Sequence, residues 1–456
     1  MQNFMEPKSV ALIGISRKSG PGSFNLMENM IRFGFCGEIF PVNPNTDEIL
    51  GKKAYPNVRA VKKKIDLAVI TAPREKTLSI LEDCVAAKIK AAIVVNQGFR
   101  DSDRHGQDMQ QRMTEVARRD GIRILGPNTL GVINAFNNFT TSFMPVAKNR
   151  APVGLICQSG IHFVGPHKFS GKVGKGVDLG NACDIGFYDA LKYLGEDPEI
   201  KIIAIHMEGL NQGKDFLSLV ANVVKDKPIV VHKSGSSNTG AGAAMSHTGS
   251  MAGNYRLLKA ALKQAGATFL EQGGQMAHAV KTLVNLPLMK GSRVGVVTYS
   301  GGAGIMVSDG LERDGLQLAS FSPETIQQVA KLSPAWMPLG NPLDIWPAVM
   351  LHGGRKAYSV ALKAVLNDAN VDGVICIAIA PLPEFSFLDV SESLNAVMEE
   401  SPARKPVIGW IYGPNTTEVK KSFESKKRIM IYPTLEIASW ALSLLRDRHK
   451  IIKRNH

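Results

Sequence analysis

The chain has 456 residues, 44% of them hydrophobic and 21% charged, which is the composition of a globular protein of about three domains. The formal net charge of +14 fits phosphorylated small molecules as well as nucleic acid, but no helix-turn-helix, zinc-finger or RNA-recognition signature accompanies it, and we expect no nucleic-acid partner. No apolar run approaches the roughly 20 residues that cross a bilayer, no apolar leader begins the chain, and the five cysteines form no CxxC pair, so we expect a cytoplasmic protein with reduced thiols and no membrane partner.

Short apolar strands alternate with helices along the first third of the chain. SVALIGI at 9–15 is a buried strand, a helix is predicted over 22–34, and GEIFPVNP at 37–44 supplies the second strand. IDLAVITAP, a helix near 75–88 and KAAIVVNQGF continue the alternation, which GIRILGPNTLGVIN closes near residue 135. Strands of β-branched residues that alternate with helices predict an α/β fold with a doubly wound parallel sheet.

The same alternation resumes twice after an irregular segment at 136–152. The second unit opens on VGLICQSG and the third on SRVGVVTYSGGAG, so both open on a strand that ends in a Ser-Gly pair and leads into a helix. This similarity indicates a weak internal duplication. We expect three doubly wound domains, at 1–148, 149–288 and 289–456.

The first turn between strand and helix, GISRKSGPG, runs from Gly14 to Gly22. It lacks the GxGxxG spacing of dinucleotide-binding turns, and the second strand ends without the acidic residue that binds a ribose, which argues against a nicotinamide dehydrogenase. The turn can still accept a phosphate, with Ser16 as donor and Arg17 and Lys18 as charges, while the alternative is a glycine turn needed only for packing. The residues in place of the acidic one are Val42, Asn43 and Pro44.

Three further strand ends carry small and polar residues. Ligands of open parallel sheets bind beyond the carboxyl ends of the strands, so we expect these loops to line one crevice that holds a cofactor. Each loop alone could be ordinary turn chemistry. The residues are Thr71, Ala72, Pro73, Asn96, Gly98, Pro127 and Asn128.

Two other turns join a strand to a helix and offer unpaired N–H groups at the positive end of a helix dipole. The first is Gln158-Ser159-Gly160 and the second contains Gly301 and Gly302. Two such ends that face each other would bind a phosphate, although each alone could be a plain turn.

One histidine, His247, stands in a run of small residues at 238–253 that cannot anchor itself in a core. Imidazole is a competent phosphoryl acceptor near neutral pH, and a small-residue loop can approach an anion. Glu208 follows the strand KIIAIHM and could accept a hydrogen bond from the second ring nitrogen of His247. The alternative is a surface loop that contains a histidine. No group of residues has metal-ligand spacing, so we expect no metal site.

Taken together, these motifs resemble the NDP-forming acyl-CoA synthetases, relatives of succinyl-CoA synthetase, and most closely the alpha subunit of ADP-forming acetate–CoA ligases. The resemblance covers nearly the whole chain, and its most specific part is the SHTG-x-x-AG motif with an EG pair upstream. The motifs are residues 10–22, FPVNP, GPN-x-LGVIN at 126–134, QSG at 158–160, LGN at 179–181, MEG at 207–209, KSG at 233–235, SHTGSMAG at 246–253, GG-x-G at 301–304 and GNPLDI at 340–345.

The resemblance implies a Rossmann-like domain that binds coenzyme A (CoA), followed by two flavodoxin-like domains of the succinyl-CoA synthetase type. It also implies that phosphate attacks acyl-CoA to give an acyl phosphate, that His247 takes the phosphoryl group, and that Glu208 stabilises it. Asn181 would lie near the acyl group, and the amides after Ser159 and Gly301 would hold the phosphate.

The same resemblance implies a partner, because the family's ATP-grasp module is not found in this sequence. We expect it on a beta subunit that binds ATP or ADP with Mg²⁺, in a heterotetramer with two copies of each chain, and a small carboxylic acid as substrate.

Two positions depart from the family: Ile161-His162-Phe163 follow QSG, where Ala-Leu or Ala-Phe is usual, and Thr129 follows GPN, where succinyl-CoA synthetases have Cys. The alternative function is an inactive CoA-binding or acyl-CoA-binding protein that acts as a sensor or scaffold.

Overall fold

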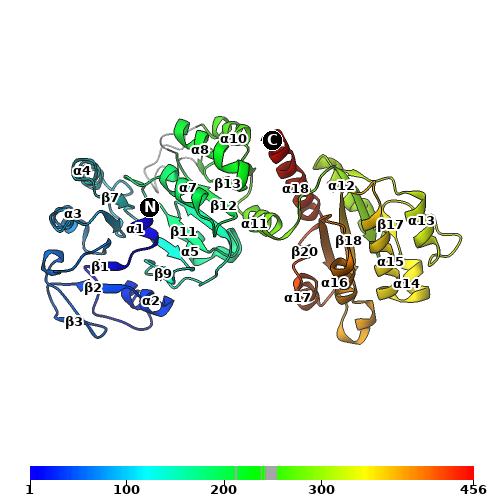
Figure 1. Ribbon diagram of the computed structural model, residues 1–456, viewed down its shortest axis with the longest axis horizontal. Helices are drawn as coiled ribbons and strands as arrows, with labels where there is room; N and C mark the ends of the chain where they lie inside the picture. The colour runs from blue at the N-terminus through cyan, green and yellow to red at the C-terminus, as the bar shows by residue number, and fades with distance from the viewer. Residues whose placement is uncertain (211–212, 238, 241, 243–253, 456) are drawn as a thin grey trace. The chain divides into compact units, whose positions relative to one another are not determined.

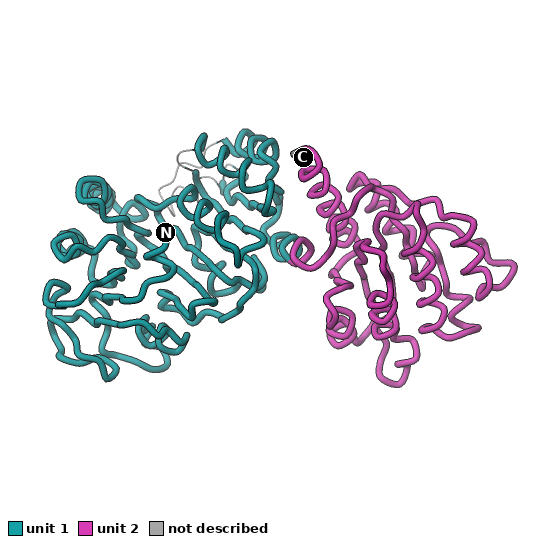
Figure 2. Tube along the Cα trace, viewed as in Figure 1, with its two compact units in different colours: residues 1–280 teal, residues 281–456 magenta. Residues whose placement is uncertain are grey.

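The computed structural model describes residues 1–210, 213–237, 239–240, 242 and 254–455. These residues divide into two compact units, 1–280 and 281–456 (Figure 2). Each unit contains its own apolar cores. Helix α11 (Gln275–Asn285) runs across the boundary between the units.

The first sheet of unit 1 is parallel, with strand order β2-β1-β5-β6-β7. Its strands β1, β2 and β7 are labelled in Figure 1. Tyr55 adds a parallel bridge to Val42 beside β2. The order then corresponds to 3-2-1-4-5-6, which is the Rossmann order, and the expected fold of this part is confirmed. Its elements are β1 (Ser9–Ile13), α2 (Leu26–Phe33), β2 (Glu38–Val42), β5 (Leu67–Ile70), α3 (Thr77–Ala86), β6 (Ala91–Val94), α4 (Arg104–Asp120) and β7 (Arg123–Leu125), with α1 (Gln2–Met5), β3 (Glu48–Ile49), β4 (Lys52–Lys53), η1 (Val58–Ala60) and η2 (Arg74–Lys76) around them.

Both faces of this sheet are buried, which explains why its inner strands β5 and β6 are apolar throughout. Along β1, Val10 and Leu12 belong to the core that includes α2, whereas Ala11 and Ile13 belong to the core beneath α3 and α4. Successive side chains of a strand point to opposite faces, so this division follows directly from the sequence.

The second sheet of unit 1 has the order β14-β13-β12-β10-β11-β8-β9. Its five parallel strands follow the flavodoxin order 2-1-3-4-5, as expected. Its elements are β8 (Val132–Asn134), β9 (Phe139–Thr140), β10 (Val153–Cys157), α5 (Ile161–Val164), α6 (Pro166–Phe169), β11 (Lys175–Asp178), α7 (Phe187–Glu196), β12 (Ile202–Met207), α8 (Gly213–Asp226), β13 (Ile229–Lys233), α10 (Tyr255–Gln264) and β14 (Thr268–Leu270).

The segment that we expected to be an irregular linker contains strand β9, and β8 before it pairs antiparallel with β11. Threonine hydroxyls join β8 to β9: Val132 N donates to Thr141 Oγ1 at 2.9 Å, and Thr140 Oγ1 donates to Val132 O at 3.0 Å. Phe139 is fully buried against Phe35, with ring centroids 4.9 Å apart. The chain therefore enters the second sheet before residue 135, while the division into three domains stays a prediction.

Unit 2 is built on one parallel sheet with the order β16-β15-β18-β19-β20, and β17 also pairs with β15. This is again the 2-1-3-4-5 order, which is what a duplicated unit would have. Its elements are β15 (Arg293–Thr298), α12 (Gly301–Arg313), β16 (Gln317–Leu318), α13 (Pro323–Ala330), β17 (Leu343–Asp344), α14 (Trp346–His352), α15 (Gly354–Asn367), β18 (Gly373–Ile379), η3 (Pro383–Leu388), α16 (Ser391–Glu400), β19 (Val407–Tyr412), α17 (Thr416–Glu424), β20 (Ile429–Tyr432) and α18 (Leu435–Asn455).

Candidate active site

The first turn of unit 1 is held in place by two asparagines. Asn25 caps α2 by accepting a hydrogen bond from Glu28 N at 3.1 Å, and its amide nitrogen donates to Ser16 O at 3.0 Å and Lys18 O at 2.9 Å. From the other side, Asn43 Nδ2 donates to Ile15 O at 2.9 Å. The side chains of Lys18 and its neighbour Arg17 are exposed. The turn thus presents two cations at the start of a helix, which is a suitable environment for phosphate.

Gly14 is the point where this turn meets the end of β5. Its φ of +82° favours glycine, and a Cβ placed on it would lie 2.6 Å from the backbone nitrogen of Ala72. Gly22 also has positive φ, but nothing lies within 4 Å of its ideal Cβ. Position 14 therefore requires glycine because the first turn and the loop after β5 approach each other closely there.

The three polar strand ends expected to share a crevice lie at one edge of the first sheet. Thr71 N donates to Ile13 O at 2.8 Å, and Asn128 N donates to Asn96 O at 2.8 Å. Asn96 Nδ2 in turn bonds to the carbonyl of Ala72. Of the remaining predicted residues, Pro73 occupies the N-cap position of η2. The carbonyl of Gly98 accepts a hydrogen bond from the Arg74 guanidinium at 2.6 Å, and the carbonyl of Pro127 accepts one from Asn181 N at 2.9 Å.

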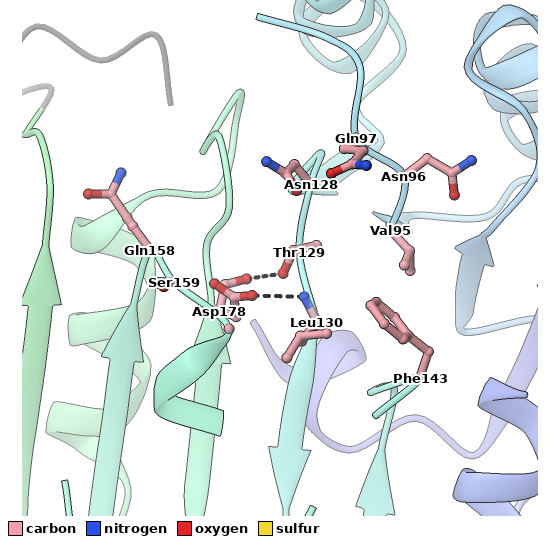
Figure 3. Close-up of a pocket in the computed structure, with 11 residues that line it drawn as sticks. Val95, Asn96, Gln97, Asn128, Thr129, Leu130, Phe143, Gln158, Ser159 and Asp178 are labelled. Carbon is pink, nitrogen blue, oxygen red and sulfur yellow. Dashed lines mark hydrogen bonds between the residues drawn. The ribbon is translucent and has the colours of Figure 1, made fainter. Parts of the chain in front are cut away.

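Two cavities begin at this edge. One, of about 210 Å³, is lined by Gly14, Ser16, Asn25 and Thr71 among others. The second, of about 510 Å³, extends from Asn96 and Asn128 to the turn at Gln158-Ser159-Gly160 (Figure 3). Val95 and Phe143 line both cavities, so the two adjoin. An extended ligand can run from the first turn to the start of α5.

Glu208 is held by two buried side chains. Gln158 Oε1 accepts the backbone N–H groups of Glu208 at 2.7 Å and Gly209 at 3.0 Å. Lys233 is 1% exposed, and its Nζ donates to the carbonyls of Glu208 at 2.7 Å and Ser234 at 2.7 Å. Burial lowers the pKa of Lys233, and the charge of Glu208 opposes that shift. The backbone of Glu208 is thus held by two side chains, one that directly follows β10 and one at the end of β13.

Asp178 lies at the end of β11 and lines the larger cavity. It is 2% exposed, and its Oδ2 accepts Leu130 N at 2.8 Å while Thr129 Oγ1 bonds to its backbone carbonyl (Figure 3). Burial raises the pKa of Asp178 to about 6, and hydrogen bonds from Leu130 and Gly180 oppose that rise. A carboxyl with such a pKa can exchange a proton near neutral pH.

Asn181 is fully buried in a network between two loops of unit 1 and is not among the residues that line either cavity. Its Nδ2 donates to Asp101 Oδ1 at 2.7 Å and Gln110 Oε1 at 3.0 Å. Arg100 donates to the Asn181 carbonyl at 3.0 Å. The position of the acyl group beside Asn181 stays a prediction.

The residues that depart from the family after QSG lie outside the two cavities. Ile161 is 53% exposed, whereas His162 is 3% exposed and packs between Phe169 and His206, with ring centroids at 4.9 and 4.2 Å. Burial lowers the pKa of His162 to about 4, so this ring is neutral at physiological pH. Helix α5 is a single turn, and its dipole is correspondingly small.

The second expected helix end belongs to unit 2. Helix α12 begins at Gly301, and its N-cap Ser300 accepts Ala303 N at 3.4 Å. A Cβ on Gly301 would lie 3.1 Å from Asp344 Oδ2. A Cβ on Gly302 would have only Ser300 Oγ within 4 Å. Ser159 belongs to unit 1, so the joint binding of a phosphate by the two turns stays a prediction.

His247 lies outside the described residues. Within the described part of the chain, no group of three or more His, Cys, Asp or Glu side chains could hold a metal ion. None of the helices described is long and apolar enough to cross a membrane.

Sequence reasoning missed two groups at this site, Asp178 and Lys233. Each adjoins a motif that was noted: Asp178 precedes LGN, and Lys233 opens KSG. The available signal was a charged residue at the carboxyl end of a buried strand, where burial demands a partner or a function.

Two family models match the chain in the order of its sheets. The CoA binding domain matches residues 8–135, and the succinyl-CoA ligase like flavodoxin domain matches residues 150–283. These matches identify an α/β protein with a CoA-binding domain.

Individual relatives are more specific. The chain is 30% identical to the acetate–CoA ligase [ADP-forming] II subunit alpha of Pyrococcus furiosus, with 98% of each chain covered. It is 38% identical to the acetate–CoA ligase [ADP-forming] II of Archaeoglobus fulgidus, where the match covers 82% of this chain and the chain spans only 56% of the relative's length. The solved Ca. Korarchaeum cryptofilum dinucleotide forming acetyl-coenzyme A synthetase 1, in complex with phosphate and ADP, superposes with a TM-score of 0.87 at 30% identity, covering 100% of this chain and 98% of that one. The chain belongs to the family of alpha subunits of ADP-forming acetate–CoA ligases.

Proposed function

We propose that the chain is the alpha subunit of an ADP-forming acyl-CoA synthetase, which interconverts acyl-CoA, ADP and phosphate with a carboxylic acid, CoA and ATP. The observation that carries the proposal is the pair of adjoining cavities, which joins a phosphate-accepting turn at Gly14 to the turn at Ser159 inside a chain of this family. A nicotinamide dehydrogenase would need an acidic residue at the end of β2 to bind the ribose of its cofactor. This chain has Asn43 there, and its side chain supports the first turn.

CoA is a substrate in this reaction, and the described residues fit it. The exposed Arg17 and Lys18 supply charge for its phosphates, and the open space at Gly22 leaves room beside them. The polar loops of Thr71, Asn96 and Asn128 line the route toward the larger cavity. The acyl end of the ligand then reaches the turn at Ser159.

The phosphoryl group travels on His247 in this proposal. The amides of Ser159 and Gly160, with those at Gly301 and Gly302, hold the phosphate, and Glu208 stabilises the charged imidazole. Dividing the transfer into acyl phosphate and phosphohistidine steps replaces one difficult reaction by two easier ones. The fixed backbone of Glu208 supports this role, because a carboxylate that orients a histidine must itself be held in position.

The nucleotide site belongs to a partner subunit. The relative of equal length is named subunit alpha, and the longer ligase of Archaeoglobus fulgidus carries further sequence beyond the matched region. We propose that the partner is an ATP-grasp beta subunit that binds ADP or ATP with Mg²⁺ and that two copies of each chain form a heterotetramer in the cytoplasm.

The test is ATP synthesis from acyl-CoA, ADP and phosphate by the chain alone and by the chain with its co-expressed ATP-grasp partner. Acetyl-CoA, propionyl-CoA, isobutyryl-CoA and phenylacetyl-CoA cover short, branched and aromatic acids. We expect ATP only when both chains are present. A reconstituted pair that binds CoA and forms no ATP from any of these thioesters would contradict the proposal and favour a CoA-binding sensor.

A further inference from the structure

The carboxyl group of Asp178 stands where three parts of unit 1 meet. It ends β11, in register with Cys157 at the end of β10, and its Oδ2 accepts the amide of Leu130 from the loop before β8. A Cβ on Gly160 would lie 3.9 Å from the same oxygen. Asp178 thus lies beside the turn that is proposed to hold phosphate and lines the same cavity (Figure 3).

Within the described part of the chain, the contacts of Asp178 include no compensating cation. The charged or titratable groups that face it are the thiol of Cys157, which donates to Oδ1 at 3.9 Å, and the carboxylate of Glu208, which repels it. Its remaining contacts are the N–H groups of Leu130 and Gly180 and the hydroxyl of Thr129. No lysine or arginine is among the described residues that line this cavity.

A carboxylate beside an expected phosphate site is unfavourable if its only role is structural, because like charges repel. The reaction does, however, require proton transfer at this place. In acyl-CoA synthesis the thiol of CoA must lose a proton, and the phosphate that leaves the acyl group must gain one.

We propose that Asp178 is the catalytic acid–base group for acyl transfer between phosphate and CoA. Its carboxylate takes the thiol proton as the sulfur forms its bond to the acyl carbon. The bond from that carbon to the phosphate oxygen then breaks, and Asp178 delivers the proton to the departing phosphate. In the reverse direction the proton passes from hydrogen phosphate through Asp178 to the leaving thiolate, so atoms and charge balance in both directions.

This inference rests on the proposed function but concerns only one of its two half-reactions. Transfer of the phosphoryl group from ATP to the histidine and on to the acid involves no thiol. Asp178→Asn should therefore leave the phosphorylation half intact, because an asparagine oxygen can still accept the amide of Leu130. Pocket carboxyls of this kind contribute typically about 10²- to 10⁴-fold to a rate.

The experiment uses the chain with its partner subunit, ATP and acetate, or the fastest acid of the panel above. Three products are measured: ³²P label on the chain from [γ-³²P]ATP, acyl hydroxamate formed with hydroxylamine, and acyl-CoA formed with CoA. For Asp178→Asn we expect label and hydroxamate within about threefold of wild type and a loss of about 10²-fold or more in acyl-CoA. The acidic limb near pH 6 in the wild-type rate of acyl-CoA formation should also disappear.

The matched control is Asp184→Asn, because Asp184 also accepts a backbone amide, that of Ile124 at 2.8 Å, but lines neither cavity. This control should form all three products at wild-type rates. The inference is overturned if Asp178→Asn forms acyl-CoA at a rate close to wild type, or if it loses label and hydroxamate to the same extent as acyl-CoA, which would indicate a structural role. Absence of label from the wild-type pair would instead contradict the proposed function.

Discussion

At the scale of single residues, two carboxyl groups lie at the carboxyl ends of the strands that flank β10. Asp178 is the last residue of β11, and Glu208 comes directly after β12. Both are buried, at 2% and 8% exposure, and each raises the cost of ionising the other. They differ in their hydrogen-bond partners: the Lys233 ammonium donates to the Glu208 backbone carbonyl, whereas the donors recorded for Asp178 are N–H, S–H and O–H groups. Burial without a cation among these donors accounts for the raised pKa of Asp178, about 6, which suits a group that exchanges a proton.

Asp178→Asn should stabilise unit 1 at neutral pH relative to acid pH. The folded pKa of about 6 lies above the ordinary value of 3.8, so the ionised carboxyl destabilises the fold by about 3 kcal/mol. This destabilisation is fully present above pH 6 and disappears as the pH falls toward 3.8. The difference in Tm between variant and wild type should therefore be larger at pH 7.5 than at pH 4.5. Calorimetry at both pH values measures it, and an equal difference would contradict the pKa assignment.

Lys233→Met should impair both folding and phosphorylation. The variant leaves the buried carbonyls of Glu208 and Ser234 without their donor, which should cost about 1–3 kcal/mol of stability. It also removes the cation near Glu208, so the ³²P label from ATP should form more slowly even where the variant is folded. Lys214→Met on the exposed face of α8 is the control and should change neither Tm nor labelling. Normal labelling by folded Lys233→Met would show that Glu208 needs no such support.

The residue types at the site could be predicted better than their contacts. Polar residues at strand ends were found from the alternation of strands and helices, because the topology alone brings those ends to one edge. The support of Glu208 by Gln158 and Lys233 could not be found this way, since it depends on two side chains, from the ends of two different strands, that meet the backbone after a third. The buried state of Asn181 was missed for the same reason: its partners, Asp101 and Gln110, lie 80 and 71 residues away in sequence.

At the scale of elements, the turn from Gly14 to the start of α2 is a rigid cradle and not a flexible loop. Asn25 and Asn43 hold its carbonyls, and Gly20 N donates to Glu28 Oε2 at 2.8 Å. The helix begins at Leu26, four residues later than predicted, because the cap is formed by Asn25 and not by the glycines before it. The cradle leaves its two basic side chains free to meet phosphate.

Gly14→Ala should weaken CoA binding far more than Gly20→Ala. Both glycines have positive φ, at +82° and +88°, so both variants carry backbone strain of about 1–2 kcal/mol. Only at Gly14 would the new Cβ meet backbone, that of Ala72, whereas Gly20 has open space. Titration calorimetry with CoA compares the two variants, and equal affinities would mean that the approach of the two loops does not shape the CoA site.

The antiparallel pair β8–β9 is one element that the sequence did not predict. Its strands are three and two residues long, and the intervening asparagines are typical of a loop. Pairing with β11 and burial of Phe139 decide its structure, and these long-range interactions override local propensity. Most of the parallel strands, by contrast, were predicted because they consist mainly of buried apolar residues.

At the scale of the whole molecule, the described chain has two units with separate cores. All residues proposed to bind CoA belong to unit 1. A ligand that binds only the folded form stabilises the part that holds it, by about 2.7 kcal/mol at a concentration 100-fold above its Kd. We expect two thermal transitions, of which CoA raises one, and hydrogen exchange should assign the protected amides to residues 1–280. Equal protection of both units would contradict a CoA site built from unit 1 alone.

The central claim, transfer of a phosphoryl group through His247, is tested most directly by labelling the reconstituted pair with [γ-³²P]ATP. The account predicts an acid-labile, base-stable label on this chain that is discharged by ADP and is absent from His247→Asn. A label that persists undiminished in His247→Asn would contradict it.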